Sequence, residues 1–162
     1  MNGPVGGTLI HAAVPSPAET ALVSLLKERN CLADALYYEA RGEGEAGQKA
    51  VAEVIFHRMQ NRYYPSTICG VVFQGSNLRK GCQFSFTCSG EMNARKSPVA
   101  WARAKRLAAN ILTGAVALGD MTDDATSYHA VSVDPVWAGH LLKTVQIGNH
   151  IFYRVPPRTT PS

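Results

Sequence analysis

The stretch EAGQKAVAEVIFHRMQNR, residues 45–62, predicts a long helix at the centre of the fold. Its larger apolar residues recur with the spacing of one buried or amphipathic helical face. These residues are Ala50, Val51, Val54, Ile55 and Met59. Tyr63-Tyr64-Pro65-Ser66 comes next, and proline interrupts a helix because it lacks the N–H group that a helix needs. We expect the core to form around this helix, with a short helical segment after it at residues 66–72.

Two further helices are predicted before the central one. Ser16-Pro17-Ala18-Glu19 combines a capping box with proline at the first helical position, so we expect a helix from there to about Arg29. Residues 31–41 continue with helical spacing and predict a second helix, which Gly42 and Gly44 end. Residues 1–15 are small and aperiodic, and we expect them to form a flexible arm.

The second half of the chain alternates helices with short strands. Ser97-Pro98 predicts the start of a helix that Gly114 ends, and Gly148-Asn149 predicts the two-residue turn of a β-hairpin. The other predicted segments are a half-exposed strand at 83–87, an extended segment at 128–133, a short helix at 135–143, hairpin strands at 144–147 and 150–155, and a disordered tail at 156–162. Helices first and short hairpins later favour an α+β fold over a parallel α/β sheet.

Length and composition indicate one domain, which we place at residues 16–155. The chain has 162 residues, of which 46% are apolar, and this suffices for one core but not comfortably for two. With 16 Lys and Arg against 12 Asp and Glu, the net charge of +4 favours an anionic polymer or surface as a partner. No run of basic residues interleaved with aromatic ones occurs, which argues against nucleic acid.

Four cysteines bear on the compartment in which the chain works: Cys31, Cys69, Cys82 and Cys88. Their even number fits disulfides in an oxidising compartment, and buried thiols in a reducing one remain the alternative. A straight strand would place Cys82 and Cys88 about 20 Å apart, so these two can pair only if the chain turns between them. The connectivity stays open. We see neither the basic start of a secretion signal nor a stretch that predicts membrane insertion.

Glu39 is the candidate catalytic acid. It follows Tyr37-Tyr38 near the end of the predicted helix at 31–41, among aromatic and small residues. Apolar neighbours disfavour the carboxylate anion and raise the pKa of the acid, so it keeps its proton near neutral pH. Cleavage of a glycosidic bond needs such a proton donor. The structural alternative is an ordinary surface glutamate at a helix end.

Five blocks, taken in order, resemble the SleB-like cell wall hydrolases, the family named for spore-cortex-lytic enzymes. The resemblance covers residues 31–154, nearly the whole chain after the N-terminal arm. The blocks are LYYEARGE at 36–43, GQKAVA at 47–52, QFS at 83–85, YHA at 128–130 and IGNHIFYR at 147–154.

This resemblance implies a lysozyme-like fold, mainly helical with short β-hairpins, that acts on peptidoglycan. It also implies that the first glutamate of the E-A-R-G-E block, Glu39 here, is the catalytic acid. Family members with an assigned chemistry look like lytic transglycosylases, which cut between N-acetylmuramic acid and N-acetylglucosamine and leave a 1,6-anhydro ring. The residues implied to line the sugar groove are Gln83, Phe84, Ser85, Tyr128, His129 and Ala130.

Glu43 is the second carboxylate to weigh, and we group it with the substrate-binding residues. At four residues from Glu39 it would share a helix face only if the helix continued through Gly42. Its structural alternative is a pairing with Arg41 or with backbone amides in the turn. A lytic transglycosylase needs one carboxyl group, whereas a hydrolytic muramidase or N-acetylglucosaminidase needs two. The rings of four residues are expected in the core rather than as sugar platforms: Phe84, Phe86, Trp101 and Trp137.

Other functions fit the sequence less well. A zinc peptidase needs clustered ligands, and the chain has neither an H-E-x-x-H motif nor a close His/Cys pair. No cysteine stands out as a nucleophile. A non-catalytic wall-binding module remains a rival.

We therefore expect no metal, no cofactor and a monomer whose partner is peptidoglycan. We expect the protein to be either a phage endolysin that waits in the cytoplasm or an exported bacterial enzyme that acts outside the cell membrane.

Overall fold

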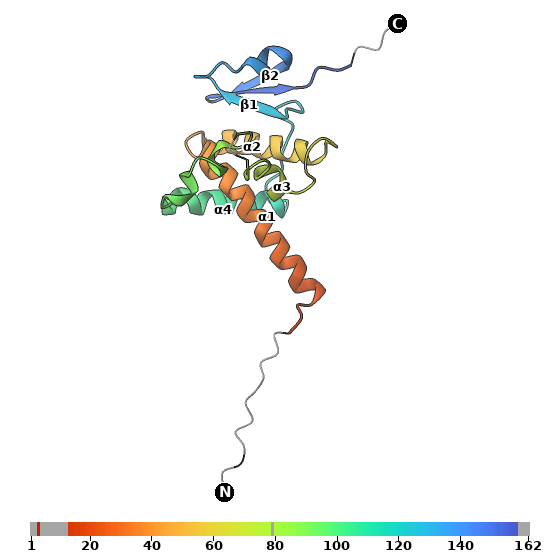
Figure 1. Cartoon of the computed structure of the whole chain (residues 1–162), viewed down its shortest axis with the longest axis vertical. Helices are drawn as coiled ribbons and strands as arrows, with labels where there is room; N and C mark the ends of the chain where they lie inside the picture. Colours follow the sequence, from red (N-terminus) through yellow and green to blue (C-terminus); the bar gives the residue numbers. More distant parts are fainter. Residues whose placement is uncertain (1–2, 4–12, 79, 159–162) are drawn as a thin grey trace.

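The computed structural model describes residue 3, residues 13–78 and residues 80–158, and it places a small sheet above a group of helices (Figure 1). Most of the predicted arm and the last four residues of the predicted tail lie outside the described residues. This mainly helical order confirms the predicted α+β class. In chain order the elements are α1 (Pro17–Ala40), α2 (Gly44–Met59), α3 (Ile68–Val72), the 3₁₀ helices η1 (Ser85–Thr87) and η2 (Glu91–Asn93), α4 (Pro98–Leu112), β1 (Ser127–Ala130), the 3₁₀ helix η3 (Val136–His140), β2 (Leu142–Ile147) and β3 (His150–Arg154).

The predicted central helix is α2, and it is buried on two faces. Val51 and Ile55 pack with the second half of α1, whereas Ala50 and Val54 pack under Phe152 of the sheet. Figure 1 shows the sheet on one side of α2, with α1 and α4 on the other. The small and β-branched side chains of α2 let both layers approach closely, as dense core packing requires. The helix thus joins the two halves of the core.

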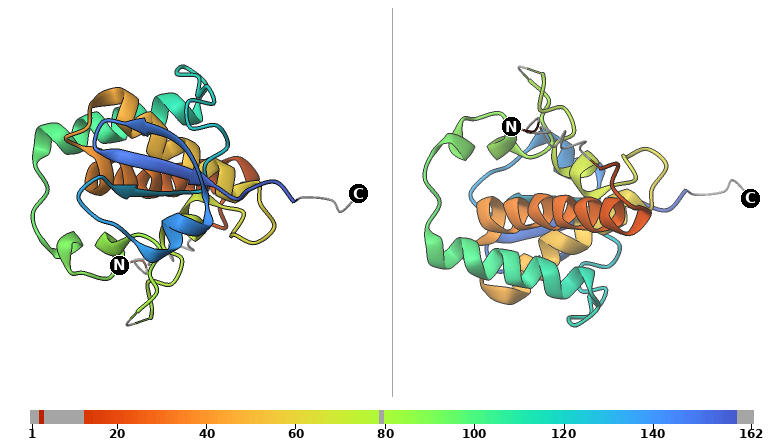
Figure 2. Two further views of the ribbon diagram at one scale, coloured as in Figure 1. Left: turned by 90° about the horizontal axis from the view of Figure 1, so that it is seen from above. Right: turned by 90° about the horizontal axis from the view of Figure 1, so that it is seen from below.

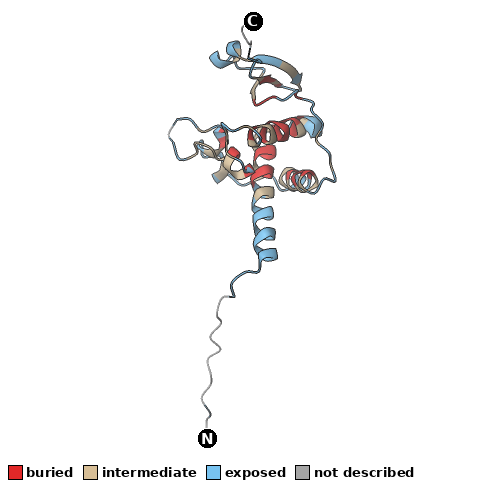
Figure 3. Ribbon diagram, turned by 90° about the vertical axis from the view of Figure 1, so that its right-hand side faces the viewer, coloured by how far each residue is buried: buried red, intermediate tan, exposed pale blue. Residues whose placement is uncertain are grey.

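α1 is one helix of 24 residues, where the sequence analysis predicts two. Ser16 caps it as expected and accepts a hydrogen bond from the Glu19 N–H at 3.1 Å. Neither glycine nor proline lies at the predicted break, so the helix continues. Its first half projects from the domain and leaves Leu22 and Leu25 exposed (Figure 3). Only the second half enters the core, and it carries Glu39 with it.

The other helices hold α1 in place. α4 begins at Pro98, as predicted, and lies beside α1 (Figure 2), with Leu107 and Ile111 in the shared core. A disulfide between Cys31 and Cys69, whose Cα atoms are 5.2 Å apart, ties α1 to α3. None of the helices in the described part of the chain is long and apolar enough to cross a membrane.

The prediction of a strand at residues 83–87 is wrong. Cys82 and Cys88 form a disulfide with their Cα atoms 6.4 Å apart, and the segment between them contains η1. A strand would hold those two residues about 20 Å apart, so the closed loop excludes it. Phe84 and Phe86 are 3% and 2% exposed. The alternation of polar and aromatic residues therefore reflects one buried side of a tight loop.

The sheet has the strand order β1-β3-β2, and both pairings are antiparallel. β2 and β3 form the predicted hairpin, whose turn holds Gly148 at a φ of +56°, a conformation that glycine adopts without strain. β1 pairs with the other edge of β3, and this register sets Tyr128 opposite Phe152. Because Phe152 packs on α2, its neighbour Tyr128 also faces the helices. The sheet thereby directs one hydroxyl group toward α1.

Candidate active site

Glu39 lies in the last turn of α1, where the helix meets the sheet. Its side chain is half-buried, and Oε2 accepts a hydrogen bond from the Tyr128 hydroxyl at 2.9 Å. Phe152 and His150 of β3 back the Tyr128 ring, with centroid distances of 5.4 and 4.9 Å. A helix end and a strand therefore hold this carboxyl–hydroxyl pair in a defined geometry.

Burial raises the pKa of Glu39 above its ordinary value, because the anion loses its hydration. The Tyr128 hydrogen bond lowers this pKa, the negative charge of Glu91 raises it, and the positive charge of Arg58 lowers it. Burial also raises the pKa of Tyr128 well above its usual value, and the nearby Glu39 charge adds to the rise. The hydroxyl thus stays neutral and donates. The arrangement suits a carboxyl group that holds a proton for transfer.

Arg58 of α2 is a buried cation beside this pair that the sequence alone did not point to. It is 6% exposed, and its Nε donates a hydrogen bond to the Thr126 carbonyl at 2.7 Å. Its guanidinium lies 5.1 Å from the centre of the Tyr64 ring and 5.4 Å from that of Phe84. Its position, four residues after Val54 on a buried helix face, was the available signal.

A cavity of about 660 Å³ opens beside the pair. Tyr128 and Arg58 form part of its wall. Glu39 is not a lining residue, but it hydrogen-bonds to Tyr128 of the wall. The other polar and aromatic residues of the wall include Gln83, Ser127, His129, Trp137 and His140. A smaller cavity of about 170 Å³ includes Tyr38 and Glu91 in its wall. Residues that neighbour Glu39 therefore border two hollows.

His129 and Trp137 form one side of the larger cavity. His129 Nδ1 donates to the Ala130 carbonyl at 2.7 Å, so in the neutral ring Nε2 accepts from the Tyr153 hydroxyl, 2.9 Å away. The Trp137 ring lies 5.6 Å from His129 and 5.5 Å from Tyr153. At 39% exposure, Trp137 is a wall residue of the cavity, and the expectation that it belongs to the core is wrong.

Glu43 contacts the sheet instead of the cavity. α1 ends at Ala40, so Glu43 does not continue the helix face of Glu39. Its Oε2 accepts a hydrogen bond from the Asn149 N–H at 3.0 Å. A Cβ atom on Gly148 would lie 2.2 Å from that oxygen, so only glycine permits this approach. The carboxylate connects the α1–α2 turn to the β2–β3 turn. This contact is similar to the structural alternative for Glu43, which was binding to backbone amides, but the amide belongs to the hairpin turn.

The structure gathers some of the predicted substrate-binding residues and separates others. Gln83, Tyr128 and His129 line the larger cavity. Phe84 is buried in the core, so its ring is not available to a ligand in this conformation. Ser85 is exposed and is not part of the wall of the larger cavity.

Comparison with known proteins gives a family for residues 42–153, which match the model of the Cell Wall Hydrolase family. The match begins just after Glu39. The spore cortex-lytic enzyme of Halalkalibacterium halodurans is 32% identical over 126 residues, which are 75% of this chain and 33% of that protein. Those of Oceanobacillus iheyensis and Bacillus subtilis are 49% and 46% identical over 43 residues, 26% of this chain and 16% and 14% of theirs. The chain matches a third or less of the length of each of these relatives.

Two solved structures share the fold. The catalytic domain of the germination-specific lytic transglycosylase SleB from Bacillus anthracis has a TM-score of 0.60 and 27% identity, over 78% of this chain and 93% of that one. The catalytic domain of the Bacillus cereus SleB protein gives 0.60 and 27%, over 80% and 91%. The lysozyme-like fold expected from the sequence is confirmed. The family model and these relatives agree, and the chain belongs to the cell wall hydrolase family.

Proposed function

We propose that this chain is a peptidoglycan lytic transglycosylase in which Glu39 serves as both acid and base. The hydrogen bond between Tyr128 and Glu39 carries the proposal, because it fixes a carboxyl group of raised pKa beside a cavity of ligand size. Membership of the cell wall hydrolase family supports the substrate. The similarity to a solved lytic transglycosylase domain supports the reaction.

In the first step, protonated Glu39 gives its proton to the oxygen between N-acetylmuramic acid and N-acetylglucosamine, and the glycosidic bond breaks. The carboxylate then accepts the proton of the muramic acid C6 hydroxyl as that oxygen attacks the anomeric carbon. This closes a 1,6-anhydro ring and returns the proton to Glu39. The nucleophile belongs to the substrate and is already close to the reacting carbon, so one carboxyl group suffices.

Tyr128 and Arg58 support the carboxylate between the two steps. The Tyr128 hydrogen bond and the Arg58 charge both favour the anion, which opposes the effect of burial. The carboxyl group can therefore lose its proton and recover it, and neither form is fixed. Such balance is what a group needs when it acts first as an acid and then as a base.

The position of Glu43 favours transglycosylation over hydrolysis. Hydrolysing glycosidases use a second carboxylate about 5–9.5 Å from the first to attack the sugar or to activate water. Glu43, the nearest acid along the chain, hydrogen-bonds to the peptide N–H of Asn149 in the hairpin turn. We assign it a structural role.

The two cavities offer room for sugars near the bond that is cut. A glycan strand must bind through residues on both sides of that bond, and wall residues of both cavities neighbour Glu39. In the larger cavity, Gln83 and His129 supply hydrogen-bonding groups, and the half-exposed Trp137 supplies an apolar ring face. We propose these three as substrate contacts.

The two disulfides support a site of action outside the reducing cytoplasm. Cys31–Cys69 fixes the buried half of α1, which carries Glu39, so reduction of this bond would loosen the element that holds the acid. An oxidising compartment that contains peptidoglycan is the setting this arrangement fits.

The test is product analysis of purified peptidoglycan digested by the chain. Mass spectrometry is expected to find muropeptides that end in 1,6-anhydro-muramic acid. The Glu39→Gln variant keeps a hydrogen-bond acceptor for Tyr128 and should yield none, while the Glu45→Gln variant, changed at an exposed acid of α2, should yield the wild-type products. Muropeptides that end in reducing muramic acid would show that the chain hydrolyses the bond, and would contradict the proposed transglycosylation. Binding to peptidoglycan without any soluble product would replace it by a non-catalytic module.

A further inference from the structure

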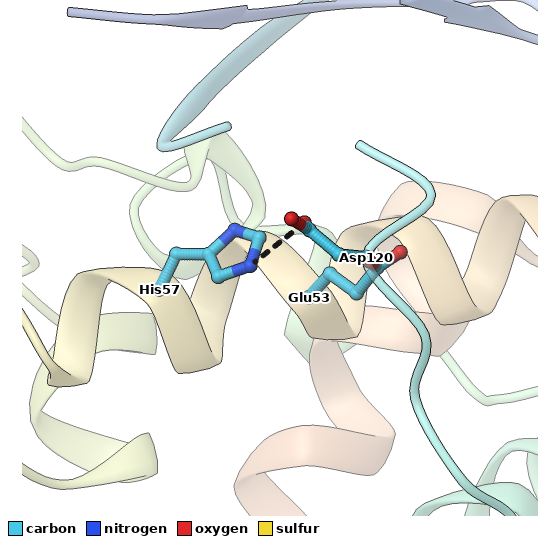
Figure 4. Close-up of side chains that lie close together, drawn as sticks. All are labelled: Glu53, His57 and Asp120. Atoms are coloured by element: carbon cyan, nitrogen blue, oxygen red, sulfur yellow. Dashed lines mark ion pairs between the residues drawn. The ribbon is translucent and has the colours of Figure 1, made fainter. Parts of the chain in front are cut away.

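Three potential metal ligands converge between α2 and the loop that precedes β1 (Figure 4). Glu53 and His57 stand one helical turn apart on α2, and Asp120 comes from the loop after α4. One ligand atom of each lies within 4.8 Å of the other two. Residues four apart share a helix face, so the loop has only to supply the third group.

Glu53 has a buried carboxyl group that lacks a full partner. The residue is 2% exposed, and neither carboxylate oxygen has a hydrogen bond of acceptable geometry within the described residues. The peptide N–H groups of Met121 and Thr122 point toward it without completing such a bond. Buried carboxylates in proteins are paired or bind metals, because an isolated buried charge is very costly. A buried carboxyl group without a partner either keeps its proton or binds a cation, and the two further potential ligands beside Glu53 favour a cation.

His57 is oriented as a metal ligand would be. Its Nδ1 lies 2.7 Å from the Ala125 carbonyl oxygen, which can only accept, so the proton of the neutral ring is on Nδ1. This leaves the Nε2 lone pair free, facing Asp120 Oδ1 at 3.5 Å. Two ligands on a tetrahedral ion with bonds of about 2.0–2.1 Å lie about 3.3–3.5 Å apart. A backbone carbonyl that fixes the ring in this way is common around ligating histidines.

We propose that Glu53, His57 and Asp120 bind one divalent transition-metal ion, and that Zn²⁺ is the metal that fits this ligand set. Zinc accepts imidazole nitrogen and carboxylate oxygen together, whereas Mg²⁺ and Ca²⁺ prefer sites made of oxygen alone. The Asp120 side chain is 60% exposed, so an ion can enter from solvent and keep a water ligand.

The bound ion acts on the fold and takes no part in the glycosidase chemistry. It joins α2 to the loop that leads into β1, the strand of Tyr128. Its presence should raise stability without changing which bond the chain cuts. The inference is independent of the proposed function, because it rests on a separate set of side chains.

The test uses the untagged chain, freed of metal with a chelator and then titrated with ZnCl₂. Calorimetry should detect one ion per chain, and the unfolding midpoint should rise by about 5–10 °C at free Zn²⁺ near 100 times the dissociation constant. MgCl₂ and CaCl₂ at the same concentration should not raise it. In His57→Asn, the new amide can still donate to Ala125 but the Nε2 ligand is lost. Loss of an outer partner of a metal ligand costs about 10–100-fold in affinity, so loss of a ligand should weaken binding at least 100-fold.

The matched control is Asp124→Asn, which removes one negative charge from the same loop but no ligand. It should leave the zinc affinity unchanged. Asp120→Asn is the second variant, chosen because an exposed site tolerates it and its amide oxygen still accepts from the Asp124 N–H. The proposal is overturned if the wild-type chain binds no zinc. It is equally overturned if Asp120→Asn binds as tightly as wild type, or if Asp124→Asn loses as much affinity as Asp120→Asn.

Discussion

Glu39 and Glu43 lie four residues apart, on either side of the point where α1 ends, and the fold gives them different hydrogen-bond partners. Both carboxylates link the helical layer to the sheet. Glu39 accepts from the hydroxyl of Tyr128 on β1, at the edge of a cavity. Glu43 accepts from the backbone N–H of Asn149 in the β2–β3 turn. The difference arises because the chain turns after Ala40, so equal side chains meet different elements.

Under the proposed function, Glu39 acts in catalysis and Glu43 supports the geometry of the site. Glu43 fixes the hairpin turn, β3 of that hairpin pairs with β1, and β1 carries Tyr128 to Glu39. The structural acid thereby helps to position the partner of the candidate catalytic acid. Changes at the two residues should therefore differ in kind, and not only in size.

The largest expected effect is the loss of activity in Glu39→Gln. Removing an essential general acid usually costs about 10²–10⁴-fold in rate, and here the same group also serves as the base. We expect kcat on peptidoglycan to fall at least this far. The amide can still accept from Tyr128, so the variant should fold. Turbidity loss of a peptidoglycan suspension measures the rate, and circular dichroism checks the fold. A folded variant that retains more than a tenth of the wild-type rate contradicts the assignment.

The next effect is expected for Tyr128→Phe, which removes the hydroxyl and leaves the ring packing in place. A hydrogen bond to a charged group contributes about 1.5 kcal/mol, so kcat should fall about tenfold. The hydrogen bond lowers the pKa of Glu39, so its loss raises that pKa. Because the acid must be protonated, the alkaline limb of the kcat/KM profile should move to higher pH.

Tyr153→Phe is the control for this shift. It removes a hydroxyl from the neighbouring strand that hydrogen-bonds to His129 and not to Glu39. Its alkaline limb should coincide with that of the wild type. Equal displacement of the limb in both variants would show that the sheet as a whole, and not the Tyr128 hydroxyl, sets the pKa of Glu39.

Glu43→Gln should show the reverse pattern, with a loss of stability and little loss of rate. A charged acceptor is replaced by a neutral one at the Asn149 N–H, so the free energy of unfolding should fall by about 1–2 kcal/mol. Glu45→Gln removes a charge from the same helix start without this contact, and should cost less than about 1 kcal/mol. Urea unfolding compares the two. If kcat of folded Glu43→Gln fell as far as that of Glu39→Gln, Glu43 would be a second catalytic carboxylate.

Sequence periodicity predicted the elements whose packing is local and regular. The spacing around Val54 predicted α2, and Gly148-Asn149 predicted the hairpin. A helix face and a two-residue turn depend on residues that are close together in the sequence. Periodicity predicted the wrong structure where a constraint from outside the segment sets its conformation. The alternation at residues 83–87 fits a strand, but the Cys82–Cys88 disulfide closes the segment into a loop. The break near Arg29 had no glycine or proline to enforce it, and α1 continues.

The candidate site divides in the same way. Glu39 could be chosen because its apolar neighbours stand beside it in the chain, and the family resemblance supplied Tyr128. Arg58 was missed because two of its contacts, the Phe84 ring and the Thr126 carbonyl, come from distant parts of the chain. Asp120 lies 63 residues after His57, a separation that no metal-binding motif of fixed spacing covers. Contacts between remote segments need the fold.

A smaller effect is expected for Glu91→Gln, which removes a negative charge near Glu39. That charge raises the pKa of Glu39, so the variant should have a lower one. The alkaline limb of kcat/KM should therefore move to lower pH, opposite to Tyr128→Phe. Raising the salt concentration should shrink this displacement, since the interaction acts through space. A limb that moves to higher pH would show that Glu91 does not act on Glu39 by its charge.

The smallest expected effect is a pH-dependent gain of stability in Glu39→Gln. Burial raises the pKa of Glu39 in the folded chain above its unfolded value, so the folded chain binds a proton over a pH range in which the unfolded chain has lost it. Stability then falls as the pH rises from the unfolded pKa through the folded pKa. Glutamine does not titrate, so the variant escapes this decline, while every other titrating group contributes equally to both proteins. The unfolding midpoints should coincide below the unfolded pKa and separate above it, with the variant more stable. A wild-type chain that gained stability relative to Glu39→Gln over this range would place the folded pKa below the unfolded one and remove the physical basis for Glu39 as the acid.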